Sequence, residues 1–381
     1  MTVRELITIE EFVTLSAKLN YQLSSPRVHQ EALLALVLGP ADLGEDDRKL
    51  LLRTFDVLQA GYHLEKRRLG TPGILHPLRA AALLCRSVRP TLMHLLCSLL
   101  HDKDEDLTLG ELGVERFGEM QSAYGDLLRE LGPERAAALK ARIDVLSNDD
   151  PHGYEAYLGR VLDSARTMPE VLHVKLCDRL DNTFDVHLQH PGITRFNFYR
   201  AVFDILFVPR FGGVDMGRFH FMPDVDQGVM LLSQLFKDLT FLSLLRNEGL
   251  DKVDADTAKL FNGLAVAGIR EAQWLALESF NTTITDVHAQ RAMLLEVMTY
   301  CTAGGIESVT THDKGGDLDG MLLKTFKAQK AGERRKMLAE LFLDRPQLTR
   351  MVLTFIVVFA AFINDSEYRI RGIDRAGTTA A

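Results

Sequence analysis

Residues 95–106 read Leu-Leu-Cys-Ser-Leu-Leu-His-Asp-Lys-Asp-Glu-Asp, so polar and acidic residues directly follow a strongly apolar segment. The spacing of the apolar residues predicts a buried helix over Thr91–Leu100 that ends at His101 and Asp102. An ionised carboxylate beside a buried helix is costly unless a partner or a metal ion neutralises it. The segment therefore predicts a helical core with a functional site at the end of one core helix.

The same three- and four-residue spacing continues on both sides of this helix, and strict alternation of polar and apolar residues is scarce. We therefore expect an all-α fold. A first helix is predicted from Ile9, Phe12, Leu15 and Leu19, which lie on one helical face. Beyond this helix and Thr91–Leu100, the predicted helices are Ala32–Leu38, Asp47–Tyr62, one beginning at His76-Pro77, Ala136–Leu146, Tyr154–Thr167, Glu170–Leu188, Gly228–Leu245, Asp256–Phe280, Ala289–Tyr300, Lys324–Leu343 and Gln347–Ile363. Gly- and Pro-rich segments predict loops at 67–73, 208–226 and 304–320, and we expect the tail after Arg371 to fray.

The composition is that of a folded protein. The chain has 381 residues, of which 46% are hydrophobic and 25% charged, which excludes disorder and collagen-like repeats. Its length predicts two or three domains, or one large helical domain with an attached lobe. The net charge of −8 argues against a broadly basic nucleic-acid-binding surface.

The sequence shows no sign of export or membrane insertion. Four cysteines (Cys85, Cys97, Cys177 and Cys301) are scattered, which fits neither a disulfide framework nor a structural zinc site. The N-terminus lacks the apolar core of a signal peptide. The longest apolar run, Met351–Ile363, is well short of the roughly 20 residues that cross a bilayer. We expect a cytoplasmic protein without membrane contact.

Three more segments place polar residues where the helical pattern asks for apolar ones. They read Ile-Leu-His-Pro-Leu-Arg-Ala-Ala at 74–81, Val-Lys-Leu-Cys-Asp-Arg-Leu-Asp-Asn at 174–182 and Arg-Arg-Leu-Gly at 67–70. Together with the first segment they supply two imidazoles and two carboxylates: His76, His101, Asp102 and Asp178. This donor set suits manganese, iron, cobalt or zinc. A water molecule bound to such a metal is acidified and becomes a nucleophile.

Polar residues near these candidate ligands extend the predicted site. Glu105 and Asp106 lie three and four residues after Asp102, so a continuing helix would place them on its face to assist proton transfer. Lys175 and Asn182 lie three before and four after Asp178, so they are expected to line a substrate wall.

In this order, the patterns R-x-x-G-x-P-x-x-x-H-P, H-D-x-x-E-D and V-K-L-x-D-R-L-x-N resemble the HD-domain phosphohydrolases. Within them the chain most resembles the alarmone hydrolases, that is, the Rel/Spo-type (p)ppGpp 3′-pyrophosphohydrolases and their small stand-alone relatives. The matching segments lie between about residues 45 and 190.

The resemblance implies an all-α domain that binds one manganese ion. It implies metal ligation by four residues: His76, His101, Asp102 and Asp178. It implies that Glu105 and Asp106 assist hydrolysis. It implies substrate contacts from four further residues: Arg67 and Arg68 on the base and phosphates, Asn182 on the nucleoside, and Tyr157 near the sugar. The expected partner is a (p)ppGpp-like nucleotide.

The chain departs from the family pattern at two places. Leu69 stands where the loop usually has serine. Phe184 and Asp185 stand where the last helix of the pattern usually has arginine and threonine, which predicts a lost phosphate contact and added acidic character at the site. An adenosine-type alarmone or another 3′-phosphorylated nucleotide therefore stays open as substrate.

We expect an HD-type phosphohydrolase domain at residues 1–195, followed by an additional helical C-terminal region at 196–381. The second region does not resemble the mixed α/β synthetase domain of long Rel proteins, and it could cover the site, sense a partner or form a homo-oligomer. Two alternatives to an alarmone hydrolase stay open: an HD-type hydrolase of dNTPs or monophosphates, and a nucleotide sensor without turnover.

Overall fold

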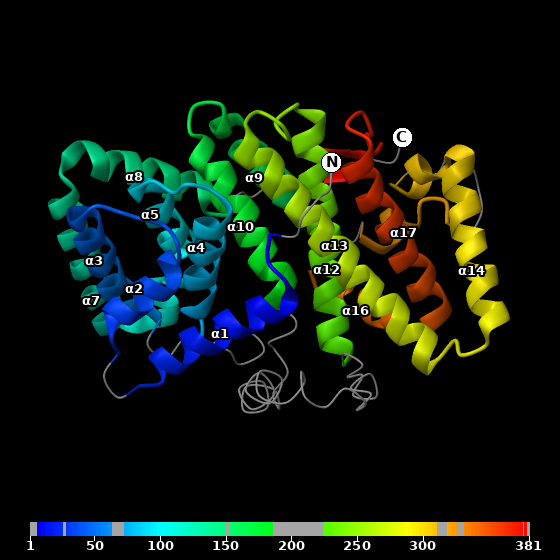
Figure 1. Cartoon of the computed structure of the whole chain (residues 1–381), viewed down its shortest axis with the longest axis horizontal. Coiled ribbons are helices and arrows are strands. Elements are labelled where there is room, and N and C mark those ends of the chain that lie inside the picture. Colours follow the sequence, from blue (N-terminus) through cyan, green and yellow to red (C-terminus); the bar gives the residue numbers. More distant parts are fainter. Residues whose placement is uncertain are drawn as a thin grey trace.

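The computed structural model describes residues 6–25, 28–62, 72–148, 153–185, 224–310, 318–326, 331–375 and 377–378. In this part of the chain the fold is all-α, which confirms the predicted fold class (Figure 1). The described strands are only two residues long: β1 (Ile373–Asp374) pairs antiparallel with β2 (Gly377–Thr378). The predicted boundary between two regions, near residue 195, lies outside the described residues.

The helices before this boundary are α1 (Ile9–Leu23), α2 (Gln30–Leu38), α3 (Glu45–Tyr62), α4 (Leu75–Ser87), α5 (Leu92–Leu100), α6 (Lys103–Asp106), α7 (Leu109–Leu131), α8 (Pro133–Leu146), α9 (Tyr154–Ala165) and α10 (Pro169–Asp185). We call these the N-terminal helices. The C-terminal helices are α12 (Val225–Asn247), α13 (Ala255–Thr282), α14 (Val287–Tyr300), α15 (Met321–Phe326), α16 (Ala331–Leu343) and α17 (Arg345–Asn364). A π-helix (Cys301–Gly305) and a 3-10 helix (Ile306–Thr310) follow α14.

Two sequence expectations need correction. The segment 304–320 was expected as a loop, yet Ile306–Thr310 is a 3-10 turn with buried Val309. The tail after Arg371 was expected to fray, yet Ile373 is buried in β1. Arg375 holds this end in place, because its guanidinium pairs with Asp163 at 2.9 Å.

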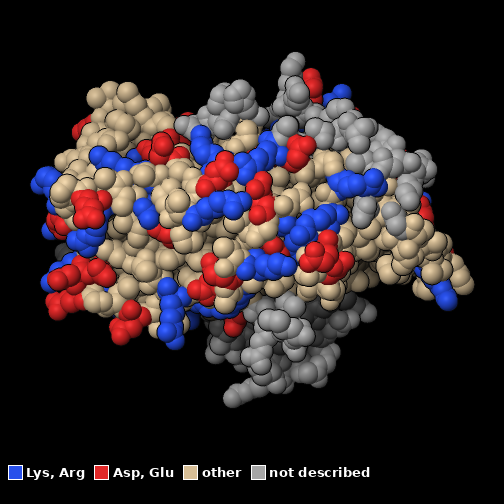
Figure 2. Space-filling model, turned by 90° about the horizontal axis from the view of Figure 1, so that it is seen from above, with Lys and Arg blue, Asp and Glu red and all other residues tan. Residues whose placement is uncertain are grey.

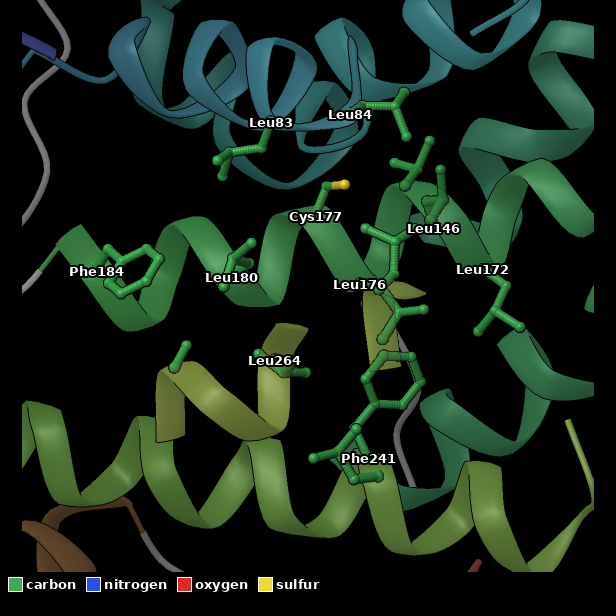
Figure 3. Packing of buried hydrophobic residues seen from close by; sticks show 14 of the residues in the cluster. Leu83, Leu84, Leu146, Leu172, Leu176, Cys177, Leu180, Phe184, Phe241 and Leu264 are labelled. Atoms are coloured by element: carbon green, nitrogen blue, oxygen red, sulfur yellow. The ribbon is translucent and has the colours of Figure 1, made fainter. Parts of the chain in front are cut away.

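Helix α10 forms the centre of the molecule and lies between the N-terminal helices and α12 and α13 (Figure 1). Its residues from Val171 to Asp185 are buried, apart from the partly exposed Asn182. In Figure 3, Leu83 and Leu84 of α4 approach it from one side, and Phe241 and Leu264 approach from the other. A helix that is buried on all sides is held by packing, because each buried Leu or Phe side chain contributes about 1.5–3 kcal/mol.

Polar contacts, of which the first two are buried, also join the N-terminal and C-terminal helices. The Arg179 guanidinium of α10 lies 2.6 Å from the Asp238 carboxylate of α12, and the Thr183 hydroxyl donates to the same carboxylate at 2.6 Å. Lys259 of α13 donates to the carbonyl of Ser87 at the end of α4, at 2.6 Å. The C-terminal helices therefore brace the helix that carries Asp178.

Two of the C-terminal helices, α12 and α17, are long and apolar enough to cross a membrane by length and composition. In the fold, 78% of the most apolar window of α12 and 56% of that of α17 are buried. Core helices of soluble proteins pass the same test, so these two helices are weak indicators of a membrane. Figure 2 shows Lys and Arg side chains interspersed with Asp and Glu over the face that it presents.

Candidate metal centre

Three helix ends and one helix interior bring the four candidate ligands together. His76 lies in the first turn of α4, where the following Pro77 lacks an N–H that the first turn would leave unpaired. His101 ends α5, and Asp102 precedes the one-turn helix α6. Asp178 lies in the interior of α10. Each of these positions was predicted to lie beside a buried apolar segment.

Side-chain atoms of the four candidate ligands lie close together. The Nε2 atom of His76 lies 3.1 Å from an Asp102 oxygen and 3.1 Å from Oδ1 of Asp178. The Nε2 atom of His101 lies 3.1 Å from Asp102 and 3.6 Å from Asp178. The two Nε2 atoms are 3.1 Å apart. One ligand atom from each of His76, His101 and Asp178 lies within 4.8 Å of the others, a grouping that could hold a metal ion.

Hydrogen bonds on the far side of both imidazoles fix their orientation. Nδ1 of His76 donates to Asp181 at 2.6 Å, and Nδ1 of His101 donates to the carbonyl of Ser98 at 2.8 Å. The proton on each Nδ1 leaves the lone pair of each Nε2 directed at the other and at carboxylate oxygens. This arrangement is repulsive unless a cation lies between the groups or an imidazole takes a second proton. The residues therefore fit a divalent metal ion.

The pKa shifts of the candidate ligands also indicate that these carboxylates are stabilised by positive charge. Burial opposes ionisation of Asp178, but the Lys175 ammonium and the two imidazoles outweigh it and hold its pKa well below the usual value. Burial likewise opposes protonation of His101, but the carboxylates of Asp102 and Asp178 outweigh it and raise its pKa. Burial also opposes ionisation of Asp102, but the imidazoles of His101 and His76 outweigh it and lower its pKa. Both aspartates are therefore ionised at neutral pH, as metal ligation requires.

A buried charged network supports His76. The Asp181 carboxylate that accepts from His76 also accepts two hydrogen bonds from Arg79, at 2.7 and 2.9 Å. Arg79 donates in addition to Asp185 at 2.5 Å. Burial opposes ionisation of Asp181, but Arg79 and His76 outweigh it and lower its pKa to about 2. Arg79 and Asp181 lie inside the sequence motifs, but no role was predicted for them from the sequence. Both are charged residues at helix positions that the apolar pattern predicts to be buried, and this could have identified them.

The two departures in α10 belong to the protein interior. The Phe184 ring is buried, with its centroid 5.2 Å from that of Phe12. The Asp185 side chain is 1% exposed and paired with Arg79. The Asp185 carboxylate is therefore buried in the core, where it shares the Arg79 guanidinium with Asp181, and the expectation that it adds acidic character to the site was wrong.

The acidic pair after Asp102 lies on the exposed side of the cluster. The Glu105 carboxylate accepts from the backbone N–H of Asn148 at 2.6 Å, and the Asp106 carboxylate accepts from the hydroxyl of Tyr62 at 3.0 Å. Desolvation by neighbouring protein atoms, together with the nearby Asp102 carboxylate, raises the pKa of Glu105, although the residue as a whole is exposed. A carboxyl group with a raised pKa suits proton transfer.

Lys175 and Asn182 both contact Asp178. The Lys175 ammonium lies 2.7 Å from Oδ2 of Asp178, and the Asn182 amide donates to Oδ1 at 2.6 Å. Tyr157 is fully buried, its hydroxyl donates to the Leu146 carbonyl at 2.7 Å, and the Lys175 ammonium lies 5.0 Å from its ring centroid. In this structure Tyr157 therefore supports Lys175. The predicted substrate contacts Arg67 and Arg68, with the neighbouring Leu69, lie outside the described residues.

A comparison with curated proteins finds similarity to the guanosine-3′,5′-bis(diphosphate) 3′-pyrophosphohydrolase of Aquifex aeolicus (strain VF5), with 30% identity over 157 residues. The alignment covers 38% of this chain and 20% of the Aquifex protein, so the chain spans about a fifth of the length of that relative. No protein-family model matches the chain, and no solved structure matches it. The similarity supports, at most, a distant relationship to this hydrolase.

Proposed function

We propose that the protein is a metal-dependent phosphohydrolase that removes the 3′-pyrophosphate of (p)ppGpp or of a related 3′-pyrophosphorylated nucleotide. The observation that carries the proposal is the grouping of His76, His101 and Asp178, with an Asp102 oxygen 3.1 Å from each of the two Nε2 atoms. The similarity to the Aquifex pyrophosphohydrolase supports the choice of substrate class.

In this proposal the four converging side chains hold a divalent transition metal, with manganese as the expected ion. The metal would supply a Lewis acid and an acidified water. Asp181 keeps His76 in the tautomer that ligation needs, and the Ser98 carbonyl does the same for His101. Lys175 stabilises the Asp178 carboxylate, and its positive charge favours approach of a phosphate group.

Glu105 is the residue assigned to proton transfer. Desolvation and the nearby Asp102 carboxylate raise the pKa of its carboxyl group, and a raised pKa favours proton exchange by this group. The hydrogen bond from Asn148 holds the carboxyl group in place. Asp106, held by Tyr62, is the second acidic group at this edge. In the proposed reaction these two residues orient and deprotonate the attacking water.

The test combines metal analysis with hydrolysis on one purified sample. We expect a bound transition metal by elemental analysis, and manganese-dependent release of pyrophosphate from guanosine or adenosine 3′-pyrophosphates in a panel that also holds dNTPs and monophosphates. Asp102→Ala should lower turnover at least about 1,000-fold while circular dichroism stays helical. The matched control is Asp46→Ala, which removes a carboxylate that is 95% exposed. Undiminished turnover in Asp102→Ala would overturn the mechanism, and activity confined to dNTPs or monophosphates would overturn the substrate class.

A further inference from the structure

Helix α12, one of the C-terminal helices, is connected to the candidate metal ligands by a short series of side-chain contacts. It packs against α9 and α10 (Figure 1). The Lys237 ammonium of α12 lies 5.0 Å from the ring centroid of Tyr154, and this ring lies 6.0 Å from the ring of Tyr157. The Lys175 ammonium lies over the Tyr157 ring and contacts Asp178. Lys237 is therefore linked to Asp178 through intervening side chains and does not contact a candidate ligand itself.

Lys237 differs from its cationic neighbours in lacking an acidic partner. Arg179 is paired with Asp238, and Lys175 is paired with Asp178. Among the described residues, no carboxylate lies within ion-pair distance of Lys237. Burial, and then the positive charges of Arg179 and Lys175, lower its pKa to about 8, so it still carries its charge at neutral pH.

The tyrosine whose ring faces this ammonium has an unsatisfied hydroxyl group. The Tyr154 hydroxyl is buried, and within the described part of the chain it has no hydrogen-bond partner. A buried hydroxyl without a partner is unfavourable, and most such groups in folded proteins are satisfied by protein, water or ligand. Tyr154 therefore combines an ammonium over its ring with an unsatisfied hydroxyl, and both groups favour a nearby anionic acceptor.

The charge balance of the cluster points the same way. The Asp178 carboxylate contacts Lys175 with one oxygen and the imidazoles with the other. A cation held by the imidazoles and Asp178 would draw on the same negative charge, so Lys175 would be less well compensated. The surroundings of Lys175 and Lys237 would then carry more uncompensated positive charge, which favours an anion.

We propose that Lys237 and the Tyr154 hydroxyl form an anion subsite, through which the C-terminal helices bind a phosphate group of the substrate remote from the reacting phosphorus. This inference rests on the proposed function and assigns the subsite to the phosphates at the 5′ end of the nucleotide. Lys237 is a binding residue in this account. Its loss should therefore weaken ground-state binding and leave the chemical step unchanged.

The kinetic test compares Lys237→Met with Lys237→Arg on the metal-loaded protein. For a 3′-pyrophosphorylated nucleotide with a 5′-diphosphate, Lys237→Met should raise KM about 10-fold, with kcat changed less than about threefold. Lys237→Arg should restore most of the affinity, and a substrate without 5′-phosphates should show no difference. A fall in kcat at unchanged KM, or an equal effect on both substrates, would overturn the assignment.

The binding test is independent of hydrolysis. Calorimetry with inorganic pyrophosphate and chelator-treated full-length protein should give a Kd that is about 10-fold weaker in Lys237→Met and weakened in Tyr154→Phe. Lys336→Met removes a lysine whose side chain is 79% exposed and should match the wild type. If 3′-pyrophosphates are not hydrolysed but this pattern holds, the proposed function fails and the subsite stands. Equal affinity in all variants, or no measurable binding to the wild type, overturns the subsite.

Discussion

At the scale of single residues, the orientation of each candidate histidine ligand depends on a partner on the side of its ring away from the cluster. His76 is oriented by Asp181, which Arg79 in turn holds with two hydrogen bonds. In metal sites, a carboxylate behind a histidine fixes the ring tautomer and raises the basicity of the ligating nitrogen. We therefore assign the precision of the site to this buried network as much as to the four converging side chains.

The first prediction concerns this network. Asp181→Asn should weaken manganese binding by about 10- to 100-fold, because the amide accepts less strongly from Nδ1 of His76 and can present its NH2 group instead. Calorimetric titration with manganese measures the effect. Asp46→Asn, a change at an exposed position, should bind manganese like the wild type. Unchanged affinity in Asp181→Asn would show that the network is not needed for metal binding.

The sequence was sufficient to name His76, His101, Asp102 and Asp178, because each lies in a local motif next to an apolar run. It was not sufficient to find the network behind them. The partners Arg79 and Asp181 are 102 residues apart, and neither spacing nor composition shows that two charges share one buried place. Lys237 carries no local motif either, and only the packing of α12 on α9 brings it near the site.

At the scale of helices, the apolar spacing located most elements to within a few residues. Helix α4 begins at Leu75, one residue before the predicted start, and α5 ends at Leu100 as predicted. Helix α7 (Leu109–Leu131) was not predicted, because several glycines interrupt its pattern. At one of them, Gly113, φ is 73° and the helix is broken, which only glycine tolerates easily. The predicted helix Lys324–Leu343 corresponds to α15 and α16, with residues 327–330 outside the described part.

A pair of histidines joins α5, α10 and the start of α13. The His94 ring stacks on the His173 ring with an interplanar angle of 8°, and Nε2 of His94 lies 3.2 Å from Nδ1 of His173. His173 continues the chain of hydrogen bonds to Thr257 at 2.9 Å. Burial and the neighbouring His173 lower the pKa of His94 to about 4. The nearby charged groups are Glu170, Asp256, Arg142 and Asp254.

The second prediction follows from the direction of this shift. The folded protein keeps His94 neutral, whereas the unfolded chain protonates it below about pH 6.5. The contribution of His94 to stability is therefore complete above that pH and is lost as the pH falls towards 4. Between pH 7 and 4.5, we expect the free energy of unfolding to fall by about 2 kcal/mol from this group, allowing for its partial exposure.

His94→Gln provides the test, because Gln can take the third position of the capping box that begins at Thr91. Urea unfolding at the two pH values should show a smaller difference for this variant than for the wild type. The exposed His288→Gln should leave the difference unchanged. The same pH dependence in His94→Gln and in the wild type would refute the prediction.

At the scale of the whole molecule, the N-terminal and C-terminal helices meet on α10. The Arg179–Asp238 pair lies at this junction, and both side chains are almost fully buried. The carboxylate raises the pKa of Arg179, while burial raises that of Asp238 to about 6 in spite of the guanidinium. The pair is therefore ionic at neutral pH.

The third prediction concerns this junction. Asp238→Ala should lower the free energy of unfolding by about 3–5 kcal/mol, because it leaves a buried guanidinium without its carboxylate. Asp226→Ala, on the same helix, breaks an exposed pair with Arg335 and should cost about 1 kcal/mol or less. Chemical denaturation at pH 7.5 measures both. Equal small losses would mean that Gln234, which also accepts from Arg179, is a sufficient partner.

Helix α10 carries Asp178 and, at the next position in the sequence, Arg179, which pairs with Asp238 of α12. The proposed metal site and the C-terminal helices are therefore not separable modules. A fragment that ends after α10 would expose to solvent the face of this helix against which Phe241 and Leu264 pack (Figure 3). Such a fragment should aggregate or lose the alignment of its ligands even though every motif residue is retained. Inactivating substitutions found by random mutagenesis should accordingly scatter across α12 and α13, far beyond the motifs themselves.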